Sequence, residues 1–206
     1  YRDVRSNYSR TGSPQLVIMA TTEEQAAATI RYAAATRATT GTRVPLSFRS
    51  GGHGLTTASV NDGGIILDIS AMNKITIDDP AQGAVRVQAG AIWGNVATTL
   101  APHDLVLTSG NFGDTGVGGL ATSGGIGYFV CAHGLTIDPI RQVRLITADG
   151  NIRTANYDEH PDLFWAVRGG SSQVGLVTEF TFEAVPLIDP DRQTKLPVIF
   201  QEVQYD

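Results

Sequence analysis

The sequence predicts an α+β fold with two small lobes that divide near residues 77–83. The first seventy or so residues alternate short apolar runs with one Ala-rich helical segment. After residue 84, period-two strands and short helices follow one another without a repeating βαβ pattern. Glycine-rich loops interrupt the regular elements of both halves. A chain of 206 residues is long enough to bury a core of its own.

A capped helix organises the first half of the chain. The hydroxyl of Thr22 and the side chain of Gln25 form a capping box, in which each satisfies a free amide of the first helical turn. The helix runs to about Arg37, and Gly41 ends it. Apolar runs that predict strands occupy residues 16–19, 44–48 and 64–69.

The second half is predicted to contain more strands than helix. Strands are expected at residues 84–89, 177–185 and 196–203, and helices at 92–100 and 161–168. In the strand at 177–185, Phe180 and Phe182 alternate with polar residues, so one face is buried. Asp149-Gly150 between two apolar runs predicts a hairpin with a type I′ turn. In the last helix, Phe164 and Trp165 are expected to fill the core.

Composition excludes several classes of partner. The net charge is −5 and no Lys/Arg run is present, so we expect no nucleic-acid binding. No apolar run reaches the length of a membrane span, and no signal segment opens the sequence, so we expect a soluble protein, either secreted or cytoplasmic. Cys131 is the single cysteine, which excludes an internal disulfide, and we expect no metal site.

The first motif is Arg49-Ser50-Gly51-Gly52-His53-Gly54, directly after a predicted strand. Adjacent glycines and a serine at such a place form a concave turn of amides that binds a pyrophosphate or a similar anion. Arg49 would add positive charge. The alternative is a plain tight turn in which His53 is a surface or core histidine.

The second motif is the glycine-dense stretch at residues 110–127. Each glycine costs up to about 1 kcal/mol in a regular element, so their number indicates backbone that must approach a flat or phosphorylated ligand. The alternative is a flexible linker. Interleaved apolar residues, among them Phe112, Val117 and Leu120, favour a packed segment instead.

Residues 116–121 also match the G-x-G-x-x-A pattern of a dinucleotide-binding site, with Asp138 about twenty residues later. That pattern has meaning only where a strand runs into the first glycine within a βαβ unit. No predicted strand leads directly into Gly116, so the sequence argues against this type of site.

A third motif, DLFWAVRGG at residues 162–170, leads to GLVTEF at residues 175–180. With the strand–helix opening and the two glycine motifs, it completes four ordered matches over residues 13–186. They resemble the FAD-binding (PCMH-type) domain of the vanillyl-alcohol oxidase superfamily, most closely that of berberine-bridge-enzyme-like FAD-linked oxidases. The resemblance implies FAD-binding subdomains at residues 14–78 and 79–188, and the start of a missing substrate domain at residues 189–206.

The resemblance implies a flavin bonded through its 8α-methyl group to His53. Phe112 occupies the position where many relatives have a second, cysteinyl link, so a single link is expected. Cys131 is expected to be a packed thiol. The other residues implied to contact FAD are Arg49, Ser50, Gly51, Gly52, Gly54, Gly113, Asp114, Thr115, Gly116, Gly119, Gly124, Gly127 and Val177.

The implied activity is hydride transfer from an alcohol, sugar or amine to FAD, with reoxidation by oxygen. The catalytic base is expected in the missing domain, or in a second chain, and His103, His133 and His160 are expected to be surface or structural residues. Three alternatives stay open: a dehydrogenase of the same fold, an FAD-binding module that needs another chain for catalysis, and an interaction domain without a cofactor.

Overall fold

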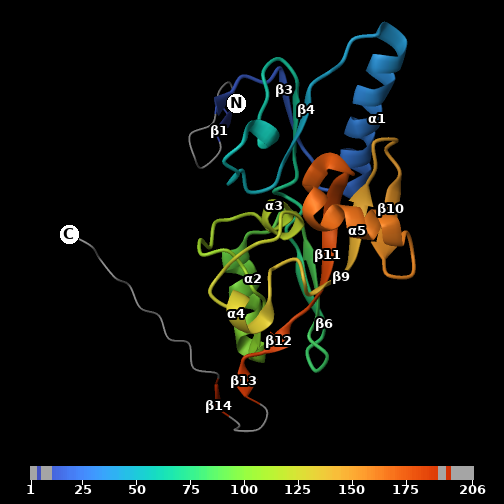
Figure 1. Ribbon diagram of the computed structural model, residues 1–206. Helices are drawn as coiled ribbons and strands as arrows, with labels where there is room; N and C mark the ends of the chain where they lie inside the picture. Colours follow the sequence, from blue (N-terminus) through green and yellow to red (C-terminus); the bar gives the residue numbers. More distant parts are fainter. Residues whose placement is uncertain (1–3, 6–10, 190–193, 196–206) are drawn as a thin grey trace, which may run out of the picture.

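The computed structural model describes residues 4–5, 11–189 and 194–195 (Figure 1). The strand expected at residues 196–203 lies outside these residues, as does nearly all of the segment 189–206. Two main sheets organise the described part: a three-stranded sheet of order β3-β5-β4 and a five-stranded sheet of order β10-β9-β11-β7-β6. Mixed helices and strands confirm the α+β class.

The first sheet is parallel. It contains β3 (Leu16–Met19), β5 (Ile65–Asp68) and β4 (Leu46–Arg49), with β5 in the middle. Helix α1 (Glu23–Thr40) connects the two outer strands, and a short 3₁₀ helix, η1 (Thr57–Ser59), precedes β5. The predicted order of strand, helix, strand and strand is therefore confirmed.

Both ends of α1 follow local side-chain chemistry. At its start, Thr22 Oγ1 accepts a hydrogen bond of 3.3 Å from the Gln25 amide. Gln25 Oε1 in turn accepts a 2.8 Å bond from the amide of Thr21, one residue before the position usual in a capping box. At its end, Gly41 has a φ of 69°, a left-handed conformation that glycine adopts without strain.

The second sheet is antiparallel throughout. Its strands are β6 (Ile75–Asp79), β7 (Ala84–Gln88), β9 (Ile140–Ile146), β10 (Ile152–Asn156) and β11 (Leu176–Glu183). The chain passes from the first sheet to the second between β5 and β6. The predicted subdomain limit at residues 78 and 79 falls at the end of β6, and the division into two subdomains stays a prediction.

Short helices and strands complete the fold. The helices are α2 (Trp93–Leu100), η2 (Ala101–His103), α3 (Val117–Thr122), α4 (Val130–His133), α5 (Pro161–Gly170) and η3 (Ser171–Gln173). The short strands pair as β1 (Val4–Arg5) with β2 (Thr11–Gly12), β8 (Leu105–Val106) with β12 (Val185–Pro186), and β13 (Ile188–Asp189) with β14 (Thr194–Lys195). Within the described ranges, no helix combines the length and apolar character needed to cross a membrane.

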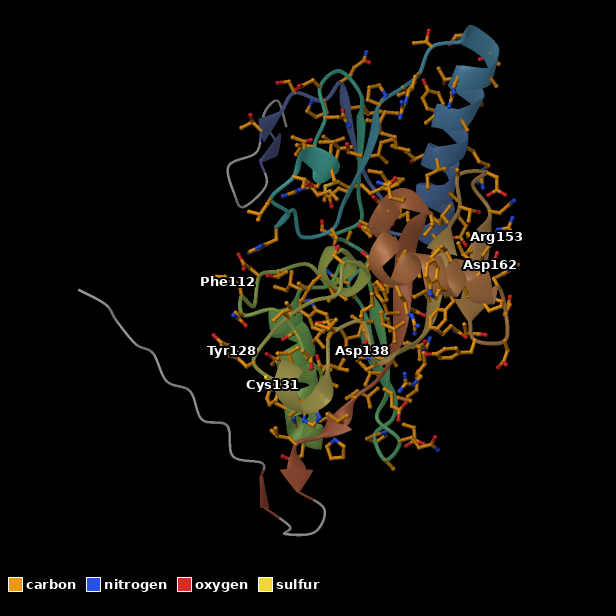
Figure 2. The ribbon with its side chains drawn as sticks, viewed as in Figure 1. Phe112, Tyr128, Cys131, Asp138, Arg153 and Asp162 are labelled. Atoms are coloured by element: carbon orange, nitrogen blue, oxygen red, sulfur yellow. The ribbon has the colours of Figure 1, made fainter. Side chains whose placement is uncertain are left out.

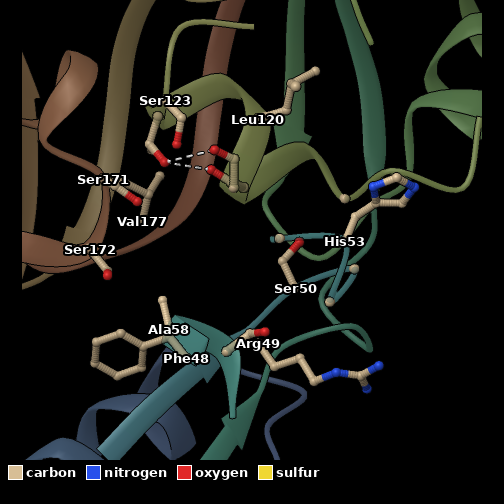
Figure 3. Close-up of a pocket in the computed structure, with 18 of the residues that line it drawn as sticks. Phe48, Arg49, Ser50, His53, Ala58, Leu120, Ser123, Ser171, Ser172 and Val177 are labelled. Carbon is tan, nitrogen blue, oxygen red and sulfur yellow. Dashed lines mark hydrogen bonds between the residues drawn. The ribbon is translucent and has the colours of Figure 1, made fainter. Parts of the chain in front are cut away.

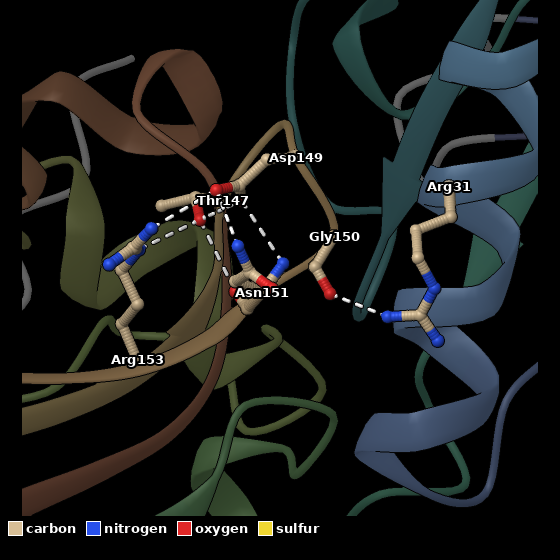
Figure 4. A network of polar contacts seen from close by, with 6 residues as sticks. All are labelled: Arg31, Thr147, Asp149, Gly150, Asn151 and Arg153. Atoms are coloured by element: carbon tan, nitrogen blue, oxygen red, sulfur yellow. Dashed lines mark hydrogen bonds and ion pairs between the residues drawn. The ribbon is translucent and has the colours of Figure 1, made fainter.

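The β9–β10 hairpin is confirmed, but its predicted type I′ turn is wrong. A type I′ turn needs positive φ at both central residues, whereas Gly150 alone, with a φ of 77°, has it in this loop. The Gly150 amide donates a 2.8 Å bond to the Thr147 carbonyl, so the turn has Ala148 and Asp149 as its central residues and Gly150 follows them. Asp149 stabilises this shape, because its carboxylate accepts bonds from Thr147, Asn151 and Arg153 (Figure 4).

The predicted burial of Trp165 and of Cys131 was wrong. Phe164 is buried as expected, but Trp165 is 76% exposed, because the short helix α5 turns only one face toward the core. Cys131 is also exposed, since it lies on the one-turn helix α4 at the molecular surface (Figure 2). The expectation of a packed thiol was therefore wrong.

One core joins the two sheets. Ala26 and Ile30 of α1 belong to the same buried cluster as Leu67 of β5, Val87 of β7 and Phe180 of β11. Helix α1 therefore covers both sheets, and the halves of the chain share their hydrophobic stabilisation.

A half-buried ion pair reinforces this junction. Arg144 of β9 binds the Glu23 carboxylate of α1 with both its Nε, at 3.1 Å, and its Nη2, at 2.5 Å. The hydroxyl of Thr178 in β11 donates a further 2.5 Å bond to Glu23. Burial by itself raises the pKa of the Glu23 carboxyl, but the hydrogen bonds from Arg144 and Thr178 lower it more, so the pKa lies below its ordinary value.

We expect Glu23→Gln to reduce the free energy of unfolding by about 1–3 kcal/mol at neutral pH, because it removes a charged partner from Arg144 and Thr178. Because the pKa of Glu23 is lower in the folded protein than in the unfolded chain, where it is about 4.3, the ionised carboxylate stabilises the fold at higher pH. This stabilisation is lost as the pH falls through the pKa of the folded state. The difference between wild type and variant should therefore shrink in acid. Urea unfolding at neutral and acidic pH measures it, with the exposed neighbour Glu24→Gln as control. An equal loss at both pH values would contradict the role of the charge.

Candidate cofactor-binding site

A cleft of about 460 Å³ lies where the two sheets meet. Its walls come from three segments: the end of β4 with the loop that follows it, the loop and helix around α3, and the connection from α5 into β11 (Figure 3). Its volume lies in the range of small-molecule sites. The first two segments are the glycine motifs identified in the sequence.

The loop after β4 is fixed from both sides. Arg49, the last residue of β4, forms a 3.1 Å ion pair with the buried carboxylate of Asp68 at the end of β5. The hydroxyl of Ser50 donates a 2.6 Å hydrogen bond to the carbonyl of Ala89, just after β7. Gly52 then takes a φ of 67°, which turns the chain back along the cleft. The loop is thereby attached to both sheets.

The two glycine motifs touch backbone to backbone at Gly51 and Gly116. A Cβ atom on Gly51 would lie 2.5 Å from the Gly116 nitrogen, and one on Gly116 would collide with the backbone of Gly51. The amides of Val117 and Gly118 donate to the carbonyls of Ala91 and Ala89, at 2.8 and 2.9 Å, which holds the start of α3 on the same strand end. Close approach therefore explains glycine at both positions.

Other glycines leave open space in the cleft. Gly54 and Gly119 line it, and a Cβ atom on either would meet nothing within 4 Å. A ligand could therefore lie directly against the backbone at both places. The hydroxyl of Ser59 also belongs to the lining, and it is buried without a hydrogen-bond partner among the described residues.

The chemistry of the lining suits a ligand with a negative group and a flat apolar part. Among the described residues of the cleft, none is Asp or Glu, and its charged or titratable side chains are Arg49 and His53. Hydroxyl groups come from Ser50, Thr115 and Ser171.

The apolar walls of the cleft consist of Phe48, Ile69, Leu120, Leu176 and Val177. Glycine-rich backbone, hydroxyls and apolar surface fit a dinucleotide such as FAD.

His53 lies at the edge of this cleft, and its side chain is 16% exposed. Its Nε2 atom lies 3.4 Å from Oδ1 of Asp114, a surface residue. The ring of Phe112 stands beside the imidazole, with the two ring centroids 5.8 Å apart. The histidine is therefore held between a carboxylate and an aromatic ring.

The structure gathers most of the residues predicted to contact the cofactor. Those that line the cleft are Arg49, Ser50, Gly51, Gly52, His53, Gly54, Thr115, Gly116, Gly119 and Val177. Gly113, Asp114, Gly124 and Gly127 lie outside the lining. Gly113 accepts a 2.7 Å bond from the Gly94 amide, and Gly127 packs directly on the Ser109 backbone. These glycines shape the loops, and their contact with a cofactor stays a prediction.

Sequence reasoning found Val177 on the third wall of the cleft but missed its two serines. Ser171 and Ser172 follow the Gly169-Gly170 pair, and Ser171 takes a left-handed φ of 51°, unusual for a residue other than glycine. The sequence signal for these serines was the change from a helical pattern to a run of small residues at 169–172. The predictions for two other residues hold, because His103 and His160 are exposed. Asp138 lies outside the cleft lining, and its carboxylate accepts a 2.7 Å bond from the Leu135 amide of its own loop.

The argument against a βαβ dinucleotide site is confirmed. Helix α3 does begin at Val117, but a loop precedes it, and the neighbouring sheet is antiparallel. Among the described residues, no strand therefore runs directly into Gly116.

Comparison with protein families decides what the cleft belongs to. The model of a family described as FAD binding domain matches residues 14–156. The chain belongs to this FAD-binding family. FAD is therefore the cofactor of this domain, and the resemblance inferred from the motifs is confirmed. Berberine-bridge-enzyme-like proteins are also among its structural neighbours.

Known relatives extend beyond this FAD-binding domain. An uncharacterized FAD-linked oxidoreductase of Bacillus subtilis, YgaK, is 34% identical over 194 residues, which are 91% of this chain and 42% of the relative. The structure of 6-hydroxy-D-nicotine oxidase from Arthrobacter nicotinovorans matches with a TM-score of 0.83 at 34% identity, over 90% of this chain and 39% of that one. Glucooligosaccharide oxidase from Acremonium strictum has a 6-S-cysteinyl, 8α-N1-histidyl FAD. Its structure matches with a TM-score of 0.78 at 28% identity, over 86% of this chain and 36% of the oxidase.

We expect alanine at Gly116 and at Gly119 to have opposite effects. Gly116→Ala should lower the free energy of unfolding by about 1–3 kcal/mol, because its methyl group has no room against Gly51. Gly119→Ala should leave the stability unchanged or raise it by up to about 1 kcal/mol, since it improves α3, yet weaken FAD binding by filling the cleft. Thermal unfolding and FAD titration of both variants test this. A destabilised Gly119→Ala would contradict the open space at that position.

Proposed function

We propose that this FAD-binding domain serves an FAD-linked oxidase, in which a hydride passes from an alcohol, sugar or amine to FAD bound covalently to His53. The observation that carries the proposal is the position of His53 at the edge of a cleft built from two touching glycine loops. The cleft is free of carboxylates among its described residues, as a diphosphate requires. Two of the similar proteins are oxidases of a nicotine derivative and of glucooligosaccharides.

Different parts of the lining would hold different parts of the cofactor. The backbone amides of the loop at residues 50–54 would bind the diphosphate. Apolar side chains such as Leu120 and Val177 would enclose flat ring surface. FAD, when bound, supplies the hydride-accepting chemistry, and the protein positions it and excludes water.

His53 would act as the nucleophile of the covalent attachment. A bond forms between an imidazole nitrogen and the 8α-methyl carbon of the flavin, while one methyl proton and the imidazole proton are released. The two electrons left by this change pass through the flavin to dioxygen, which takes up two protons and leaves as hydrogen peroxide. A single link is proposed, because Phe112 has no nucleophilic atom at the position of the second link.

The rest of the active site would come from another part of the protein. This chain spans about 40% of the relatives it matches, and His53 is the one general-base candidate among the described residues of its cleft. We propose that a C-terminal domain or a second chain contributes the catalytic base and the pocket for a small-molecule substrate. This division also supports a second candidate function, an FAD-binding module that depends on another domain or chain for catalysis.

We expect the wild-type protein to retain its flavin through acid treatment and to give a fluorescent band on a denaturing gel under ultraviolet light. His53→Ala should abolish that band, because acid then releases all of the flavin, while His103→Ala should retain it. His103 is an exposed histidine remote from the cleft lining and serves as the matched control.

The colour of the native protein separates the remaining outcomes. A yellow wild-type protein without an acid-stable band would show non-covalent FAD and contradict the attachment to His53. A band that persists in His53→Ala would place the link on another residue.

A further inference from the structure

Asp114 is the surface carboxylate nearest to the nucleophile of the proposed attachment. Its Oδ1 atom lies 3.4 Å from Nε2 of His53, although 61 residues separate the two in the sequence. Asp114 itself is 66% exposed and lies outside the cleft lining, whereas His53 is 16% exposed and belongs to it. The carboxylate therefore reaches the imidazole from outside the cleft lining.

The main chain around Asp114 is held in place by helix α2. The amide of Gly94 donates to the carbonyl of Gly113 at 2.7 Å, and the amide of Trp93 donates to the carbonyl of Thr115 at 3.0 Å. The amide of Thr115 also closes a turn on the carbonyl of Phe112 at 3.2 Å. Three hydrogen bonds thus fix both neighbours of Asp114, so its carboxylate starts from a defined backbone position.

A carboxylate at Nε2 has a chemical consequence at the other ring nitrogen. A neutral imidazole carries one proton, and a hydrogen-bond acceptor beside one nitrogen draws the proton to it. With Nε2–H directed to Asp114, Nδ1 has the free electron pair. The two nitrogens point in widely different directions in the ring plane, so Nδ1 points away from Asp114. The ring of Phe112 lies beside the imidazole, with its plane inclined 32° to it.

We propose that Asp114 is a positioning residue for cofactor attachment, which holds His53 in the Nε2–H tautomer and presents Nδ1 as the nucleophile. This inference rests on the proposed covalent bond at His53. As the bond forms, the imidazole passes through a positively charged state, which the Asp114 carboxylate stabilises before the proton on Nε2 is released. Asp114 acts through the histidine, since it lies outside the lining of the cleft.

The test separates binding of FAD from formation of the bond. The full chain is prepared without flavin, FAD is added, and two quantities are followed: the dissociation constant of FAD from fluorescence, and the rate at which acid-stable flavin appears. Asp114→Asn should slow bond formation at saturating FAD by about tenfold or more, since it removes the charge that orients the histidine. The dissociation constant should change less than about twofold, because Asp114 does not line the cleft.

Two further variants sharpen the result. Asp114→Glu keeps the carboxylate and should restore most of the rate, while Asp158→Asn, an exposed carboxylate change away from the cleft, should have no effect. A rate unchanged in Asp114→Asn would overturn the proposal. So would a parallel loss of FAD affinity, bond formation and thermal stability, because that pattern indicates a merely structural residue.

The tautomer is measured independently of the cofactor. Long-range ¹H–¹⁵N spectra of the flavin-free chain, with His53 assigned from His53→Ala, should show a protonated Nε2 and an unprotonated Nδ1, and a mixture of tautomers in Asp114→Asn. A protonated Nδ1 in the wild type would refute the positioning role. If the wild type forms no acid-stable flavin yet shows this tautomer, the covalent attachment has failed while the contact between Asp114 and His53 stands.

Discussion

The contact between Gly51 and Gly116 is the constraint on which the cleft depends. One glycine follows the parallel sheet and the other precedes helix α3, and their backbones approach so closely that neither tolerates a side chain. The hydroxyl of Ser50 and the amide of Gly118 bind the same carbonyl, that of Ala89, so both loops are anchored at one strand end. Because the loops meet there, Gly54 and Gly119 are left facing open space in the cleft.

The carboxylates lie in the framework of the fold and not in the described lining of the cleft. The carboxylates of Asp68 and Glu23 are paired with Arg49 and Arg144 in the framework, where they connect neighbouring strands and helix α1. The described cleft lining has hydroxyls, amides and apolar groups instead. A surface free of negative side chains suits an anionic cofactor, since a buried carboxylate near a phosphate would add repulsion in a medium that screens it poorly.

Much of the site could be predicted, because its motifs are local. Residues 49–54 follow a strand directly, and glycine there has few explanations other than a turn or a close approach. Ser171 and Ser172 were missed, since their place in the cleft depends on how α5 packs against α3. Trp165 and Cys131 were misjudged for a related reason: on short helices the periodic pattern is too brief to tell which face is buried.

The sequence by itself determined the opening order of strand, helix, strand and strand, the capped helix α1 and the membership in an FAD-binding family. It also singled out His53 as the candidate for the flavin link. These depend on periodicity, caps and motifs within a few residues of one another. Only the tertiary structure decided that β6 joins the second sheet, that Gly51 meets Gly116, and that Asp114 lies beside His53. Such contacts join residues far apart in the chain, and packing and backbone hydrogen bonds, which no local pattern records, bring them together.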